Sequence, residues 1–340
     1  MTEEVHKYNL LQMLMKKSRL PWLWATAMVA VVILLLGILA VFLDGEPTKL
    51  LNWGFWQSNV VGLVLIIYML VIPIFMWRLR ERAIQAFRLL LPLDDDTFNQ
   101  LATEITTPKR RWEWTSVLVG IGVAFVLGQP WNLGWGHGEL WLSVHMVITN
   151  VVSNGLLAWL IYDTLTGAVR INRLSRRDLK LGIFDIELLT PIALWSLGIS
   201  LFFIGGISLS LVFGTWEELL RWQSITTYAI LICVTILIFF LSMWSAHNAM
   251  VEAKKHKLAL ARKHLMAITQ EMEDQTVQVQ TNEMQSLSST VTSWATYHRL
   301  VQESPTWPFN AGIIRRLLAS TIVPAVIYLI KILSGLGLRF

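Results

Sequence analysis

Long apolar stretches alternate along the chain with shorter segments in which the charged residues are concentrated. About 20 consecutive apolar residues are enough for an α-helix to cross the hydrocarbon core of a bilayer. The pattern therefore predicts an all-α, polytopic transmembrane helical bundle of about seven spans. The expected spans are Trp22–Leu43, Ser58–Trp77, Trp114–Gln129, Leu140–Tyr162, Leu188–Phe213, Thr226–Ser245 and Ile313–Leu336. If the last of them is re-entrant or lies on the membrane surface, six spans remain.

The same pattern divides the chain into four parts. Residues 1–21 form an N-terminal segment, and residues 22–245 hold the first six spans, with longer loops at 78–112 and 163–187. Residues 246–310 are expected to form a coiled-coil-like helical hairpin. Residues 311–340 contain the seventh span.

Basic residues predict the orientation of the spans. All but four of the 28 lysines and arginines fall in the N-terminal segment, the two longer loops, and the stretch from the hairpin to the inner end of the seventh span, which includes Arg315 and Arg316. An excess of lysine and arginine marks the cytoplasmic side of a membrane protein. We therefore expect an integral protein of the plasma (inner) membrane with a cytoplasmic N-terminus and an extracytoplasmic C-terminus.

Composition agrees with a membrane protein. The chain is 54% hydrophobic and 15% charged, whereas soluble domains carry about 25% charged residues. The calculated isoelectric point of about 9.4 is explained by the cytoplasmic basic loops, so we expect no nucleic-acid partner. The expected partners are the lipid bilayer, further copies of the chain and possible cytoplasmic proteins.

The hairpin is predicted from two apolar stripes. In the first, apolar residues recur every seven positions, which is typical of helices that pack along a seam. These seam residues are Val251, Leu258, Leu265 and Met272. The second stripe runs from Met284 to Val301 at alternating spacings of three and four. The hairpin is either a purely intramolecular element or a stalk for self-association or gating.

The loop 78–112 has two features of its own. An interfacial helix is expected around Ala83–Leu91. The acidic run Asp94–Asp96 either caps the next helix, where negative charge is favourable, or binds a divalent cation through its carboxylates.

Polar residues gather on one broad face of the fourth span. Spacings of four place their side chains on the same side of a helix. They are His145, Thr149, Asn150, Ser153 and Asn154. Small polar residues inside a bilayer either hydrogen-bond neighbouring helices or line a hydrated pathway or ligand cavity. Both interpretations stay open, and these five residues are the candidate pathway lining.

The seventh span adds two candidates. Pro324 removes a backbone hydrogen bond and permits a kink. Lys331 lies toward the outer end of the span, where a lysine either extends to the membrane interface or lines an outer vestibule.

The overall layout is similar to that of insect odorant and gustatory receptor channels. The shared plan is seven spans, a cytoplasmic N-terminus, and a cytoplasmic helical bundle before a last span that lines the pore. The aromatic TY…QF signature of their last helix is absent here, where Thr321–Tyr328 reads TIVPAVIY. The resemblance is therefore one of layout and assigns no family.

No motif for catalysis, nucleotide binding or metal binding occurs in the sequence, so we expect neither an enzyme nor a cofactor. The leading hypothesis is an oligomeric channel or channel-like permease, gated or assembled through the cytoplasmic stalk. The alternative is a membrane-anchored sensor or scaffold without conduction. The sequence does not indicate the permeant species, the gating stimulus or the number of subunits.

Overall fold

The computed structural model of the chain describes residues 21–90, 94–106, 110–129, 140–175, 190–215, 219–275, 281–307 and 311–335. All regular elements in these ranges are helical, which confirms the predicted all-α class. The helices are α2 (Trp22–Leu43), the short 3-10 helix η1 (Pro47–Leu51), α3 (Trp53–Leu90), α4 (Asp95–Thr106), α5 (Arg110–Gly128), α6 (Leu140–Ser175), α7 (Thr190–Phe213), α9 (Trp222–Gln275), α10 (Thr281–Glu303) and α11 (Ala311–Gly335).

Five of the described helices are long and apolar enough to cross a membrane. They comprise α2, α7, most of α3 and α6, and the first 20 residues of α9. Five such helices indicate a membrane protein, as the sequence predicted. The other two expected spans fall on α5 and α11, which are not in this set of five, so the count of seven spans remains a proposal.

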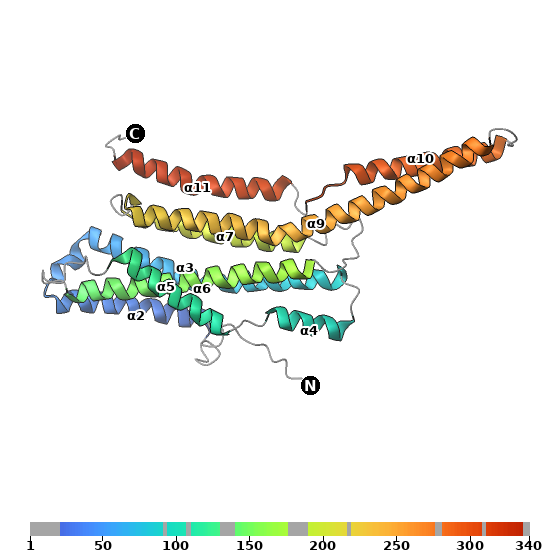
Figure 1. Cartoon of the computed structure of the whole chain (residues 1–340). Helices are drawn as coiled ribbons and strands as arrows, with labels where there is room; N and C mark the ends of the chain where they lie inside the picture. The colour runs from blue at the N-terminus through green and yellow to red at the C-terminus, as the bar shows by residue number, and fades with distance from the viewer. Residues whose placement is uncertain are drawn as a thin grey trace.

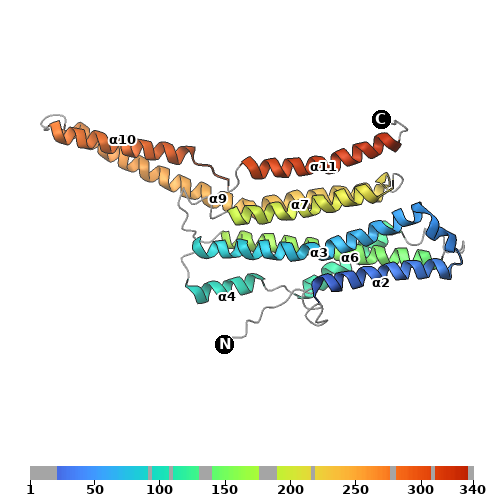
Figure 2. The ribbon, with the colours of Figure 1, turned by 180° about the vertical axis from the view of Figure 1, so that it is seen from behind.

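The helices are arranged as an elongated bundle with one projecting arm. α2, α3, α6, α7 and α11 run roughly side by side with the first part of α9 (Figure 1). The second half of α9 continues beyond the bundle, with α10 alongside it, and the view from behind shows the same projection (Figure 2). The 54 residues of α9 correspond to a length of about 80 Å at 1.5 Å per residue.

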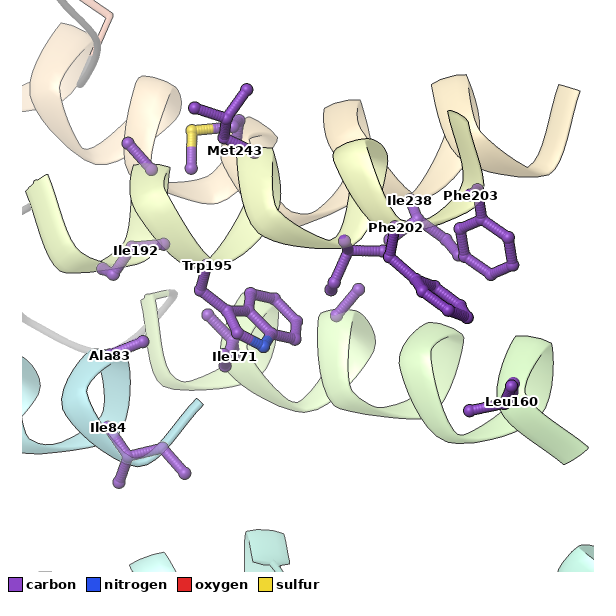
Figure 3. Close-up of a cluster of buried hydrophobic side chains, with 14 of the residues drawn as sticks. Ala83, Ile84, Leu160, Ile171, Ile192, Trp195, Phe202, Phe203, Ile238 and Met243 are labelled. Carbon is purple, nitrogen blue, oxygen red and sulfur yellow. The ribbon is translucent and has the colours of Figure 1, made fainter. Parts of the chain in front are cut away.

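The core of the bundle is formed by large apolar side chains at the centre of α7. Trp195 and Ile199 are fully buried, and Trp195 points from α7 toward Ile171 of α6 (Figure 3). Residues of α3 and α9 close the same cluster, including Phe87 and Ile238. Burying side chains of this size stabilises by about 1.5–3 kcal/mol each in water, and here the same contacts fix which helices are neighbours.

The expected interfacial helix at Ala83–Leu91 is wrong as a separate element. α3 continues without a break from Trp53 to Leu90. Ala83, Ile84 and Phe87 are buried in the core of the bundle, not at a membrane surface. Their apolar spacing of three and four satisfies either arrangement, so the sequence did not distinguish a lipid-facing helix from a core-facing one.

The acidic run that follows α3 caps the next helix. α4 begins at Asp95, and the Thr97 backbone N–H donates to a carboxylate oxygen of Asp94 at 3.2 Å. Hydrogen bonds from the Thr97 side chain and backbone lower the pKa of the Asp94 carboxyl, because they favour its charged form. These contacts support the capping interpretation of the run.

Two contacts fix α2 against α6. The Asp44 carboxylate, just after α2, accepts hydrogen bonds from the backbone N–H groups of Trp141 at 2.9 Å and Leu142 at 2.8 Å. These donors open α6 and have no partner within that helix, so a carboxylate there is favourable. Further along, a Cβ added to Gly37 would lie 2.9 Å from the His145 ring, so glycine allows the close approach.

A close contact between two helix backbones involves Gly120 of α5. A Cβ built there would lie 2.4 Å from the backbone oxygen of Asn154 and 2.7 Å from the Cβ of Ala158, both on α6. Two residues along the same helix, a Cβ at Gly122 would meet no atom within 4 Å. The small residue at position 120 therefore lets the two backbones touch, as is common in membrane bundles.

We expect Gly120→Ala to lower the free energy of unfolding by about 1–3 kcal/mol, because the added methyl group must push α5 away from α6. Gly122→Ala is the matched control and should be neutral or stabilise by up to about 1 kcal/mol, since alanine favours the helix. Thermal unfolding in detergent checks both variants. Equal losses of stability in the two would mean that α5 and α6 do not meet at Gly120.

Candidate functional site

A cavity of about 830 Å³ lies between α3, α5, α6, α7 and the start of α9. Its volume falls within the range of small-molecule sites in proteins, about 300–1,000 Å³. On α6 the lining extends from Met146 to Leu157, which is part of the length of that helix. The cavity therefore occupies one portion of the bundle.

Four of the five candidate polar residues of α6 line this cavity. They are Thr149, Asn150, Ser153 and Asn154. The Asn154 side-chain amide donates to the backbone oxygen of Asn150 at 3.0 Å and to its side-chain oxygen at 2.6 Å. The helical spacing of four thus brings the two amides together on the face that the sequence indicated.

Two hydroxyl groups on the same wall have no hydrogen-bond partner in the described part of the chain. They are Thr149 Oγ1 and Ser153 Oγ, and both atoms are buried. A buried hydroxyl without a partner costs free energy that a partner would recover. Both oxygens are closed off from water-sized molecules, so they lie behind the surface of the cavity and not on it.

The fifth candidate, His145, lies elsewhere. It is buried and its ring faces Gly37 of α2. It is not among the residues that line the cavity. The sequence grouped it with the other four because position 145 is one turn before Thr149, but the polar face is broad and its edge packs against a different helix.

The opposite side of the cavity is aromatic around Tyr68 and Phe202, and it carries polar groups further along, at Ser210, Thr227 and Tyr228. Tyr68 of α3 stacks on Phe202 of α7, with 5.3 Å between ring centroids and 11° between ring planes. The Tyr68 hydroxyl donates to the Phe202 backbone oxygen at 2.8 Å, so this tyrosine already has a partner. No pattern in the sequence indicates this pair, because its two members are far apart in the chain.

The floor of the cavity merges with the core of the bundle. Met69, Phe202 and Leu231 line the cavity and also belong to the buried hydrophobic cluster. The other end lies where α5 and α7 end and α9 begins, near Gln129 and Arg221. Arg221 is exposed, so this end is the mouth of the cavity.

The two candidates on α11 do not line the cavity. The Lys331 ammonium group donates to the backbone oxygen of Val212 at 2.9 Å and to that of Gly214. These carbonyls end α7, where a positive charge is favourable. Lys331 thus joins α11 to α7. Pro324 lies inside α11, which continues past it to Gly335.

The helical arm is held together by ring stacking and hydrogen bonds. His264 of α9 stacks on Trp294 of α10 with 4.3 Å between ring centroids. The Lys254 ammonium group donates to the backbone oxygens of Gln302 at 2.7 Å and Ser304 at 2.8 Å. These contacts place α10 along the distal half of α9.

The expected seam residues lie along this arm. Val251, Leu258 and Leu265 are half-buried, and the side chain of Met272 lies outside the described residues. Ala261 of α9 and Val301 of α10 are fully buried. These two side chains therefore lie inside the arm and not on its surface.

A charged cluster at the other end of α6 was missed from the sequence. Arg80 of α3 pairs with Asp163 of α6 at 2.6 Å, and their side chains are only 14% and 19% exposed. Arg170 is close enough to both for their charges to act on it, and Glu113 of α5 is 1% exposed. The sequence placed these residues outside the spans, because charges ended the apolar stretches on which the spans were drawn.

In comparisons with known proteins, no family model, no curated protein and no solved structure matches this chain.

Proposed function

We propose that the chain is an integral membrane channel or channel-like permease, and that its cavity is where the solute enters. The observation that supports this most is the polar wall of α6 inside an 830 Å³ cavity. Polar groups are costly inside a bilayer, and those that face a cavity often mark the path of a substrate or ion.

The proposal includes seven spans in the plasma (inner) membrane. α5 and α11 supply the two beyond the five long apolar helices, since both lie along the bundle (Figure 1). The basic residues support a cytoplasmic N-terminus and an extracytoplasmic C-terminus. In this orientation the mouth of the cavity opens to the outside, and the Arg80–Asp163 pair lies toward the cytoplasm.

The apolar floor of the cavity blocks a direct path for a solute across the bundle. Below the cavity the cluster around Trp195 and Ile199 is fully buried, so passage through one chain requires helices to move. A permease that rearranges around its cavity meets this requirement. Assembly of several chains around a shared path meets it as well, and the proposed protein is an oligomer.

The arm offers a means of control and forms a cytoplasmic helical hairpin in this proposal. α9 lines the cavity with Thr227 and Leu231 and continues as the same helix into the arm. A rigid helix transmits displacement along its length, so a force or partner on the arm would act directly on the cavity. This is how the stalk would gate or assemble the protein.

The continuity of α9 from the cavity into the arm also favours a second candidate, a membrane-anchored sensor or scaffold without conduction. In that case a molecule bound in the cavity would change the position of α9, and the arm would report this to a cytoplasmic partner. The two candidates differ in whether any solute crosses the membrane.

Flux through the purified protein decides between them. The chain is reconstituted into liposomes, and the exit of K⁺, Cl⁻ and the neutral polyol mannitol is followed with and without an applied voltage or osmotic tension. A channel or permease releases at least one of the three faster than protein-free liposomes. Rates equal to those of protein-free liposomes for all three would favour the sensor or scaffold.

A further inference from the structure

One largely buried ion pair joins two groups of helices at the end of the bundle away from the mouth of the cavity. We infer that this pair, Arg80 of α3 with Asp163 of α6, is a latch that closes the cavity on its cytoplasmic side. When the latch breaks, the two groups separate at their inner ends and the cavity opens to the cytoplasm. This role rests on the proposed function, because it uses the proposed orientation in the membrane.

The first group is built on the contact between α3 and α7. A Cβ added to Gly198 of α7 would lie 2.8 Å from Cδ1 of Leu79, so the two helices are close at this level. Nearer the mouth, a Cβ added to Gly205 would meet the Tyr68 hydroxyl. That hydroxyl donates to the Phe202 backbone oxygen at 2.8 Å. Close contact at both levels means that α3 and α7 move together.

Helices α9 and α11 are attached to the same group. Ser196 of α7 donates to the Phe239 backbone oxygen of α9 at 3.2 Å. The hydroxyls of Ser210 on α7 and Tyr228 on α9 share a hydrogen bond at 2.9 Å, and Lys331 ties α11 to the end of α7. The arm continues α9 and therefore belongs to this group.

The second group consists of α2, α5 and α6. At Gly120 of α5 an added Cβ would lie 2.7 Å from the Cβ of Ala158 on α6. The Asp44 carboxylate after α2 accepts from the backbone N–H groups of Trp141 and Leu142, which open α6. These contacts hold the three helices together as a second unit on the other side of the cavity.

The latch differs in kind from the apolar contacts between the groups. Where Trp195 of α7 points toward Ile171 of α6 (Figure 3), the contact is non-directional and can be exchanged for others as helices shift. The Arg80 guanidinium group instead donates to both carboxylate oxygens of Asp163, at 2.6 Å and 3.4 Å, and to its backbone oxygen at 3.3 Å. A Cβ at Gly167 would lie 3.1 Å from Nη2 of Arg80, so glycine lets Arg80 approach α6.

The latch lies beyond the closed end of the cavity. The lining ends at Met69 on α3 and at Leu157 on α6. Arg80 and Asp163 follow on the same two helices, about 16 Å and about 9 Å further along at 1.5 Å per residue. Separation of α3 from α6 at this level would therefore extend the cavity toward the cytoplasm.

Arg170 makes the latch reversible. It follows Asp163 on the same helix, and its charge interacts with those of both Asp163 and Arg80. When Arg80 moves away with the first group, Arg170 stays near Asp163 as a counter-charge. Separation also relieves the repulsion between the two guanidinium groups. Both arrangements of the charges are thus accessible, which a gate with two states requires.

Labelling of one thiol in the cavity from each side of the membrane tests the latch. Cys233→Ala removes the only cysteine in the sequence, and Asn154→Cys then places a thiol in the lining. A small, membrane-impermeant methanethiosulfonate reagent is applied to intact cells, which report access from outside. It is also applied to inside-out membrane vesicles, which report access from the cytoplasm. With the latch in place, we expect fast labelling in cells and slow labelling in vesicles.

Two variants in this background break the latch to different degrees. Asp163→Asn should speed labelling in vesicles at least about tenfold and should not speed labelling in cells, because the inward-open state gains population from the outward-open one. Gly167→Ala keeps every charge and favours the helix. Its methyl group displaces Arg80 by a few tenths of an ångström and should speed labelling in vesicles by about threefold. If Asp163→Asn does not fold, Gly167→Ala decides alone.

Asp95→Asn is the control, because it breaks the exposed pair of Arg88 and Asp95 and should leave both rates unchanged. Vesicle rates that stay unchanged in the latch variants, or that rise equally in Asp95→Asn, would overturn the latch. Faster labelling from both sides would mean that the pair only stabilises the bundle, and a parent thiol labelled equally from both sides would also exclude a latch.

The thiol assay does not depend on transport, so the latch and the proposed function can fail separately. If the vesicle rates rise as expected but no solute crosses liposomes, the channel or permease is wrong and the latch stands. If a solute crosses and the vesicle rates do not respond, the latch is wrong and the channel or permease stands.

Discussion

Asp163→Asn is expected to lower the free energy of unfolding of the bundle by about 2–4 kcal/mol. Removing one partner of a buried ion pair leaves the other charge uncompensated, which costs about 3–5 kcal/mol when both are fully buried. We expect a smaller loss of stability here, because the Arg80 and Asp163 side chains are still 14% and 19% exposed. Arg170 lies near Arg80, so two guanidinium groups would also face each other without the carboxylate between them.

The chain offers a matched control for this experiment. Arg88 and Asp95 form an ion pair of almost the same length, 2.7 Å, but their side chains are 53% and 71% exposed. Asp95→Asn should therefore change stability by less than about 1 kcal/mol. Chemical unfolding in detergent measures both variants. Similar small effects in the two would show that Asp163 is solvated in the folded protein and does not join α3 to α6.

Asn150→Leu is expected to reduce flux about tenfold while the protein still assembles. Leucine has a similar size but removes an amide from the polar wall and from its hydrogen bond with Asn154. Loss of one hydrogen-bond partner raises the free energy of a permeating polar group by about 1–3 kcal/mol. A barrier that is higher by about 1.4 kcal/mol corresponds to a tenfold lower rate. Liposome flux of whichever solute the parent protein carries is the measurement.

Asn99→Leu is the control for this variant, because Asn99 is exposed on α4 and does not line the cavity. Its flux should equal that of the parent protein. If Asn150 only joins helices, Asn150→Leu should instead lower stability by about 0.6–2 kcal/mol and leave flux unchanged. That result would contradict a role for the α6 wall in conduction.

Much of the fold could be predicted from the sequence, because a helix that crosses a bilayer needs an apolar stretch as long as the hydrocarbon core is thick. The apolar stretch Trp22–Leu43 is reproduced residue for residue by α2, and the sixth expected span and the first apolar stripe of the hairpin lie on the single helix α9. Charge did not end these helices, however. α3 and α6 continue past the last apolar residue of each span, and the pairing of Arg80 with Asp163 beyond those spans was not predicted.

The candidate site was predictable in part for a similar reason. Helical spacing shows which residues share a face of one helix, and four of the five α6 candidates do line the cavity. It does not show which helix packs against that face. His145 therefore turned out to face Gly37, Lys331 joins the end of α7, and the Tyr68–Phe202 wall was not foreseen.

If the bundle encloses a water-filled cavity that opens to the outside of the cell, as we propose, a thiol in that cavity should react with a reagent that cannot cross the membrane. Cys233 is the only cysteine in the sequence and is exposed, so Cys233→Ala gives a background without thiols. Asn154→Cys then places one thiol in the cavity, and Lys263→Cys places one on the arm.

Intact cells are treated with a small, membrane-impermeant methanethiosulfonate reagent, and labelling is compared with that of permeabilised cells. We expect Asn154→Cys to be labelled in intact cells and Lys263→Cys to be labelled only after permeabilisation. An Asn154→Cys variant that stays unlabelled in both, or a Lys263→Cys variant labelled in intact cells, would rule out an outward-facing, water-filled cavity with a cytoplasmic arm.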